Sequence, residues 1–187
     1  GSHIWFRFDS NDDIASFYFY LGQALKHVFP GILERFANPS PAYNTDYSAY
    51  TRKYFETLSG YVNTKLTFVF DDYEKLAKDS PLHHTIRTGI KNSGDLIHMI
   101  VLSRTSQPAV FAPLIAGKQI RIIPEQKIMM TQKESAAVIH AETGLTLTEE
   151  QMTSLYDRTS GWVTGLILLS VYHEENQTLS LDINQFI

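Results

Sequence analysis

Cysteine is absent from the 187 residues of this chain. Its absence excludes a disulfide framework, a thiol nucleophile and a zinc site with cysteine ligands. Glycine and proline are scarce, with 10 and 7 residues, which excludes a collagen-like or low-complexity chain. A chain without cysteine fits a reducing compartment, and we expect a cytoplasmic localisation.

Long apolar runs and an excess of positive charge are also missing. The apolar runs, Leu166–Leu169 among them, are far shorter than the ~20 residues of a membrane span, and we expect no signal peptide. Lysine and arginine number 16 against 20 acidic residues, so the formal charge is −4. Proteins that grip a phosphate backbone usually carry a basic face. We therefore expect neither membrane contact nor direct DNA contact from this chain.

Aromatic residues, in contrast, are plentiful: 10 Tyr and 11 Phe contribute to a hydrophobic content of 43%. Such a composition excludes a disordered chain, and the length fits one domain or one domain with an appendage. Residues 1–3 (Gly-Ser-His) resemble the remnant of an expression tag and are set aside. The remaining chain opens at Ile4 within a hydrophobic run, as expected of a segment cut from a longer protein.

The first two thirds of the chain alternate between strand-like and helix-like patterns. Continuous apolar runs, which are typical of central strands of a parallel sheet, lie between amphipathic stretches. The expected strands are 4–8, 66–70, 96–102 and 119–123; the expected helices are 12–28, capped by Asp12, then 47–61, 81–91 and a short turn at 111–115. This order predicts an α/β fold with a parallel sheet and flanking helices over residues 4–124, a partial P-loop NTPase fold.

Only helical patterns follow residue 124. Capping boxes at Thr131 and Thr148 predict two helices, and an apolar face over 162–173 predicts a third. We expect a small helical lid subdomain at 125–175 and the start of a following segment at 176–187.

Two acids follow the expected strand 66–70. A buried strand that ends in carboxylates can deliver Asp71 to Mg²⁺, which prefers oxygen ligands, while Asp72 polarises an attacking water. The alternative is that Asp72 merely caps the next turn. Two polar residues, Ser103 and Arg104, follow the next expected strand. Ser103 could sense a γ-phosphate, and Arg104 could neutralise charge that develops in phosphoryl transfer. A solvated loop is the alternative there.

These residues, taken together and in order, resemble the nucleotide-binding region of the large MalT-like, LuxR-type ATP-dependent transcriptional regulators of the STAND class. The resemblance covers about residues 4 to 175. Its motifs are Trp5-Phe6-Arg7-Phe8-Asp9, Asn11-Asp12-Asp13 with Phe17, Phe68-Val69-Phe70-Asp71-Asp72-Tyr73, Val101-Leu102-Ser103-Arg104, Leu114 with Gly117, Gln119 and Ile120, Met130-Thr131 with Glu134, and Thr159-Ser160-Gly161-Trp162-Val163-Thr164-Gly165-Leu166.

The resemblance implies an ATP-dependent switch. It makes Asp71 the Walker B ligand of magnesium, Asp72 the neighbouring acid and Arg104 the sensor residue, and it places Gly161 and Trp162 in the helical lid. A helix cap and a hydrophobic anchor are the alternatives for Gly161 and Trp162. In the parent protein it further implies ATP or ADP with Mg²⁺, self-association, and promoter binding through a separate helix-turn-helix domain.

One departure from the family is the lack of a Gly-x-x-x-x-Gly-Lys-[Ser/Thr] loop, which cradles phosphates with backbone N–H groups. We expect that loop to lie before residue 4 and the DNA-binding domain after residue 187. The chain itself is then expected to bind no nucleotide tightly and to turn over no ATP.

Three other hypotheses stay open. The Walker B and sensor strands would equally suit a fragment of an AAA-type or archaeal-type ATPase. A degenerate α/β interaction module without NTPase activity would show the same fold. A metal site from His83, His84 and His98 is the third, although their spacing is not that of a zinc motif.

Overall fold

A computed structural model describes residues 1–36, 47–144 and 146–168 of the chain. The chain divides into two compact units, Gly1–Ile120 and Arg121–Ile187, and each is described by itself. The first unit is an α/β layer and the second is helical, in agreement with the predicted fold class.

Unit 1 is built on a parallel three-stranded sheet. Its strands are β1 (Ser2–Arg7), β2 (Leu66–Asp71) and β3 (Ile97–Val101), in the order β1-β2-β3. The strand β1 begins earlier than predicted, because Ser2 is in register with Leu66 and its N–H donates to the Lys65 carbonyl. The strand β2 is paired along both edges, and four of its residues, Leu66, Phe68, Val69 and Phe70, are buried, in agreement with its continuous apolar sequence.

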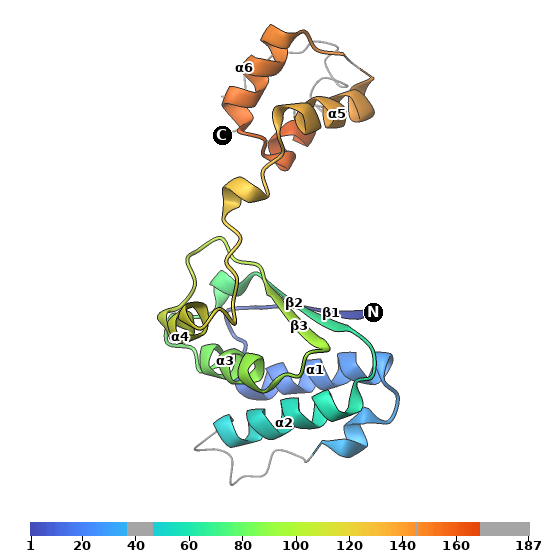
Figure 1. Ribbon diagram of the computed structural model, residues 1–187, viewed down its shortest axis with the longest axis vertical. Coiled ribbons are helices and arrows are strands. Elements are labelled where there is room, and N and C mark those ends of the chain that lie inside the picture. The colour runs from blue at the N-terminus through green and yellow to red at the C-terminus, as the bar shows by residue number, and fades with distance from the viewer. Residues whose placement is uncertain (37–46, 145, 169–187) are drawn as a thin grey trace. The chain divides into compact units, whose positions relative to one another are not determined.

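Three helices cover one face of this sheet (Figure 1): α1 (Ile14–Val28), α2 (Tyr47–Tyr61) and α3 (Leu82–Asn92). The helix α1 begins one residue later than predicted. Asp13, not Asp12, accepts from the Ser16 N–H at 2.7 Å, and Ser16 completes a capping box. Short 3₁₀ turns η1 (Ile32–Arg35) and η3 (Tyr73–Lys75) follow α1 and β2.

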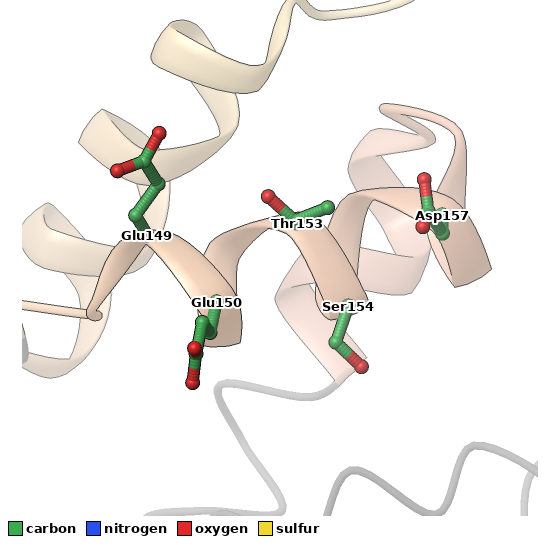
Figure 2. A pocket seen from close by; sticks show the side chains of 5 residues that line it. All are labelled: Glu149, Glu150, Thr153, Ser154 and Asp157. Carbon is green, nitrogen blue, oxygen red and sulfur yellow. The ribbon is translucent and has the colours of Figure 1, made fainter.

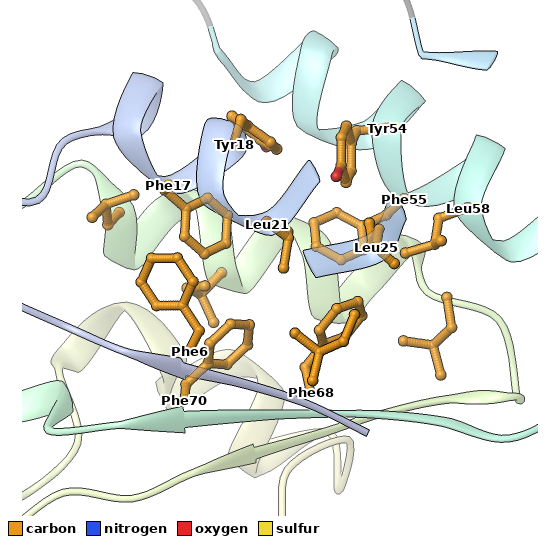
Figure 3. Close-up of a cluster of buried hydrophobic side chains, with 14 of the residues drawn as sticks. Phe6, Phe17, Tyr18, Leu21, Leu25, Tyr54, Phe55, Leu58, Phe68 and Phe70 are labelled. Atoms are coloured by element: carbon orange, nitrogen blue, oxygen red, sulfur yellow. The ribbon is translucent and has the colours of Figure 1, made fainter. Parts of the chain in front are cut away.

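The core of unit 1 is an aromatic layer between the sheet and the helices (Figure 3). Phe6 and Phe70 point up from the sheet toward Phe17 of α1, and Phe68 lies below Phe55 of α2. Full burial of one such side chain stabilises the fold by about 1.5–3 kcal/mol. These phenylalanine side chains thus join the sheet to the helices that cover it.

On the opposite face of the sheet, Val69 of the central strand is buried, whereas the side chains of the two edge strands are exposed in the part of the chain that the structure describes. Trp5 of β1 and Ile100 of β3 flank Val69 in register, and their side chains are 59% and 47% exposed. His3 and His98, one step earlier along the same strands, are exposed as well. Parallel sheets are normally covered by helices on both faces. The exposure of Trp5 and Ile100 in the apolar row Trp5-Val69-Ile100 is therefore unusual for an α/β domain.

The strand predicted at 119–123 does not form. After η4 (Ala109–Phe111) and α4 (Ala112–Ala116), the N–H groups of Gln119 and Ile120 donate to the Leu114 carbonyl rather than to a strand. Ile122 and Ile123 are 49% and 60% exposed. The β-branched run predicted a strand from local preference, but a strand also requires a neighbour, and the described sheet pairs only three strands.

Unit 2 contains η5 (Glu125–Lys127), α5 (Gln132–Thr143), α6 (Glu149–Thr159) and a helical stretch at 163–168. Both predicted capping boxes are present, at Thr131 and at Thr148. A small core joins the helices through Ile139, Met152, Leu155 and Leu166. The third predicted helix, 162–173, is thus observed over 163–168; its remainder and the segment 176–187 lie outside the described residues.

None of the helices in the described part of the chain combines the length and apolarity that a membrane crossing requires.

Candidate functional site

The ends of the three strands define the candidate site. Because the strands are parallel, Arg7 at the end of β1, Asp71 at the end of β2 and Val101 at the end of β3 lie at one edge of the sheet. Ligands of open α/β sheets bind at this carboxyl edge. The sequence-predicted residues Asp71, Asp72, Ser103 and Arg104 all belong to it or to the loops that follow.

Asp72 is held by two cations. Its Oδ2 lies 2.7 Å from Arg7 Nε and 2.8 Å from Lys75 Nζ, and its side chain is only 10% exposed. Its backbone is left-handed, with φ 53° and ψ 37°, and begins η3, a conformation that aspartate tolerates better than most residues. Hydrogen bonds from Lys75 and then Arg7 lower the pKa of Asp72 to about 2.

Asp71 sits beside this cluster with a freer carboxylate. Its Oδ1 accepts a hydrogen bond from the Asp72 N–H at 2.9 Å, which orients the group. Within the described residues Oδ2 accepts no hydrogen bond, and the side chain is half-buried. Asp71 is in register with Arg7 on β1. An oriented, ionisable oxygen at the end of the central strand is one ligand of the kind that Mg²⁺ takes.

Arg104 meets Glu74. Its Nε lies 3.5 Å from Glu74 Oε1, and its backbone N–H donates to Glu74 Oε2 at 3.3 Å, although its side chain is 88% exposed. Ser103 is exposed and shares a hydrogen bond with Thr105, 3.3 Å between hydroxyls. The structure therefore brings Asp71 and Asp72 together with Arg7 and Lys75, and Arg104 together with Glu74.

The partners of the two predicted acids, Arg7 and Lys75, were not anticipated as site residues. Two signals in the sequence could have found them. Arg7 ends a strand at the same edge as Asp71, and Lys75 stands three residues after Asp72, within one turn. The pairing itself depends on the left-handed turn at Asp72, which no pattern announces.

The histidines provide no metal centre among the residues described. His83 is buried, and its Nε2 lies 2.9 Å from the Ala77 carbonyl while its Nδ1 lies 2.8 Å from the Tyr73 hydroxyl. Both ring nitrogens are thereby occupied, as in a neutral imidazole that donates from Nε2. Burial lowers the pKa of His83. No group of three or more histidine, aspartate or glutamate side chains in the described ranges could hold a metal ion.

An acidic surface of α6 forms a hollow of about 470 Å³ (Figure 2). Figure 2 shows that the side chains leave the helix in different directions instead of converging on one point. The lining residues are Glu149, Glu150, Thr153, Ser154 and Asp157. None of the predicted site residues lies here, and exposed carboxylates that do not converge form a solvated surface.

The turn at Gly161 packs closely against the backbone of Met130. Gly161 has φ 75°, and a Cβ added there would overlap the Met130 carbonyl oxygen, while the Met130 N–H donates to the Gly161 carbonyl at 3.1 Å. The residue that caps α6 is Ser160, also left-handed, so the observed cap lies one residue before the predicted cap, Gly161. Trp162 is 55% exposed and its ring lies over Gly165, so it does not anchor the core of unit 2.

A magnesium–nucleotide group does not fit the described residues by themselves. Asp71 offers one carboxylate, and Asp72 is already paired with Arg7 and Lys75. The phosphates would need a cradle of backbone N–H groups, and the sequence has no loop of that type. No catalytic step through the nucleotide follows from these residues alone.

The chain is similar to proteins named HTH-type transcriptional regulator MalT. It is 24% identical to that of Yersinia pestis over 169 residues, 89% of this chain and 18% of the relative. It is 26% identical to that of Yersinia enterocolitica over 106 residues, 57% of this chain, and 26% identical to that of Cronobacter sakazakii over 111 residues, 59% of this chain.

The chain spans less than a fifth of the length of these curated relatives. No family model matches it. The similarity relates the chain to one region of bacterial transcriptional regulators.

Proposed function

We propose that this chain is the Walker B and sensor side of a nucleotide-switch domain in a larger bacterial transcriptional regulator. The observation that carries the proposal is Asp71, an oriented carboxylate with one open oxygen at the carboxyl end of the central parallel strand. The similarity to MalT regulators over 89% of the chain supports the same assignment.

The proposal gives separate roles to the residues at the sheet edge. In the complete site Asp71 would ligate magnesium, and Ser103 and Arg104, in the loop after β3, would sense the nucleotide. A carboxyl with a pKa of about 2 is a weak base at neutral pH, so Asp72 fits electrostatic positioning of the strand ends better than proton acceptance from water. Arg104 would leave Glu74 when it turns toward a phosphate.

The remainder of the site is proposed to come from other segments of the same longer protein. The open sheet face, with Trp5 59% and Ile100 47% exposed, supports this because a parallel sheet needs cover on both faces. The relatives are long enough to supply such segments, since the chain aligns with at most 18% of those reported above. Helices that carry the phosphate loop would bury this apolar row.

In that parent protein the chain would act as a switch and not as the DNA reader. ATP or ADP with Mg²⁺, self-association, promoter binding through a separate domain and a cytoplasmic site of action are all parts of the proposal. The formal charge of −4 supports a switch that leaves DNA contact to another domain.

Calorimetric titration of the chain with ATP, with and without Mg²⁺, tests the division of the site. We expect any Mg²⁺-dependent binding to be no tighter than about 1 mM, because the phosphate cradle must come from elsewhere. Micromolar affinity that depends on Mg²⁺ would contradict the proposal that the missing loop is essential.

A further inference from the structure

A polar groove lies on the helical layer of unit 1, between elements that pack side by side. The helices α2 and α3 pack against each other. The Phe55 ring lies over Gly89, and the Gly94 N–H donates a hydrogen bond to Ser59 Oγ at 2.8 Å. The groove beside them has a volume of about 780 Å³, which falls in the range of small-ligand sites.

The lining of this groove is basic and polar throughout. Arg52 of α2 and Arg87 and Lys91 of α3 provide three positive charges, and no lining residue is acidic or apolar. None of these three cations forms an ion pair with any described residue. Thr88, Asn92 and Gln119 add hydroxyl and amide groups.

Arg87 carries a second, independent signal. Its Nε is buried and has no hydrogen-bond partner among the described residues. A buried donor without an acceptor is costly, and native structures rarely keep one without a reason. Nε itself is shielded from solvent, but the Arg87 side chain lines the groove, so an anionic oxygen bound there would lie against the same guanidinium and offset the cost of its unpaired donor.

The chemistry of the lining selects the ligand class. Guanidinium groups pair with phosphate oxygens through two parallel hydrogen bonds, and lysine adds a point charge. The lining has no aromatic or aliphatic side chain that would cover a base or a sugar ring with apolar surface. A long nucleic acid would meet the net negative charge of the chain outside the groove.

We propose that the groove formed by Arg52, Arg87 and Lys91 binds a compact polyphosphate, the ligand being recognised by its linked phosphate groups. This site shares no residue with the sheet edge that holds Asp71, and it does not depend on the proposed nucleotide switch. Binding is expected to weaken when Mg²⁺ is added, because the cation neutralises the phosphates that the arginines recognise.

Titration of the whole chain with inorganic pyrophosphate tests the proposal by calorimetry and by amide chemical shifts. We expect a dissociation constant below about 1 mM at low salt without Mg²⁺, and a loss of at least about tenfold in Arg52→Gln and Arg87→Gln. Arg52 is exposed, so its variant keeps the test valid if Arg87→Gln disturbs folding, which circular dichroism would reveal.

The matched control is Lys53→Gln, which removes an exposed positive charge from the same helix outside the groove. It should bind within about twofold of the unmodified chain. No binding of pyrophosphate by the unmodified chain, or equal losses in Lys53→Gln and Arg52→Gln, would overturn the proposal. Tighter binding of a single-stranded oligonucleotide than of pyrophosphate would also overturn it, in favour of a nucleic-acid surface.

Discussion

Arg7 Nε lies 2.7 Å from Asp72 Oδ2 and joins two residues that are 65 positions apart in the sequence. The contact ties the end of β1 to the turn after β2, and Lys75 closes the cluster at 2.8 Å from the same oxygen. Since Asp71 orients its carboxylate on the Asp72 N–H, the ion pairs of Asp72 also set the position of Asp71.

Replacement of Asp72 by asparagine should flatten the acid dependence of stability. The folded pKa of Asp72, about 2, lies below its unfolded value of about 3.9, so the carboxylate contributes stability that is fully present above pH ~3.9. That contribution is lost as the pH falls toward 2. Asp72→Asn removes the titration while asparagine keeps the left-handed backbone.

Urea unfolding between pH 5 and pH 2 measures this effect. The control is Asp95→Asn, which alters an exposed carboxylate outside every ion pair of the described residues. The control should follow the unmodified chain, whereas Asp72→Asn should lose less stability on acidification. Parallel curves for all three chains would refute the structural role given to the cluster.

His83 should make the chain less stable in mild acid. Burial lowers the pKa of His83 in the folded chain. Below the unfolded pKa of about 6.5, the imidazole is therefore protonated more readily in the unfolded chain than in the folded chain. Stability from the neutral form is therefore complete above pH ~6.5 and declines as the pH falls toward the lowered folded pKa. His83→Gln keeps a donor for the Ala77 carbonyl and removes the titration.

Chemical denaturation at pH 7.5 and pH 5.5 distinguishes the outcomes. His98→Gln changes an exposed histidine that is not among the causes of the His83 shift, and it should retain the full acid sensitivity. If His83→Gln loses as much stability as the unmodified chain, the buried imidazole is not the titrating group.

Gly161 and Gly144 form a matched pair that tests the turn in unit 2. Both have positive φ, 75° and 71°, but a Cβ at Gly161 would overlap the Met130 carbonyl whereas nothing lies within 4 Å at Gly144. Gly144→Ala should cost about 1 kcal/mol from the left-handed backbone alone. Gly161→Ala adds the clash, and its total cost should reach about 2–4 kcal/mol.

Amide hydrogen exchange in α5 and α6 measures both costs within the intact chain. Faster exchange in Gly161→Ala than in Gly144→Ala supports the close approach to Met130. Equal exchange rates in the two variants would show that the Gly161 turn tolerates a side chain.

Much of the fold could be predicted because local patterns and tertiary needs agree. Continuous apolar runs gave the three strands, and the capping boxes at Thr131 and Thr148 gave the starts of α5 and α6. The prediction of a strand at 119–123 was wrong because a strand forms only beside a partner strand, and the sequence of the segment does not show whether a partner is present. The cap of α1 was assigned to Asp12 instead of Asp13 because either aspartate suits the position. In the structure Asp13 is the cap because it forms a capping box with Ser16.

The site was predictable in position but not in detail. Acids after a buried strand located Asp71 and Asp72 at the sheet edge. The ion pairs with Arg7 and Lys75 were missed because they depend on which strands become neighbours and on the left-handed turn at Asp72. The basic groove was missed for a similar reason: Arg52 and Arg87 are distant in sequence and meet only when α2 packs beside α3.

Magnesium-dependent ATP binding by the complete gene product that carries this sequence tests the central claim most directly. The account predicts that Asp71→Asn weakens Mg²⁺-dependent ATP affinity by at least about tenfold, because the metal loses its strand-end carboxylate. The control variant Asp95→Asn should bind within about twofold of the unmodified protein. Unchanged Mg²⁺-dependent affinity in a folded Asp71→Asn protein would contradict the assignment of this chain as the Walker B side of a nucleotide switch.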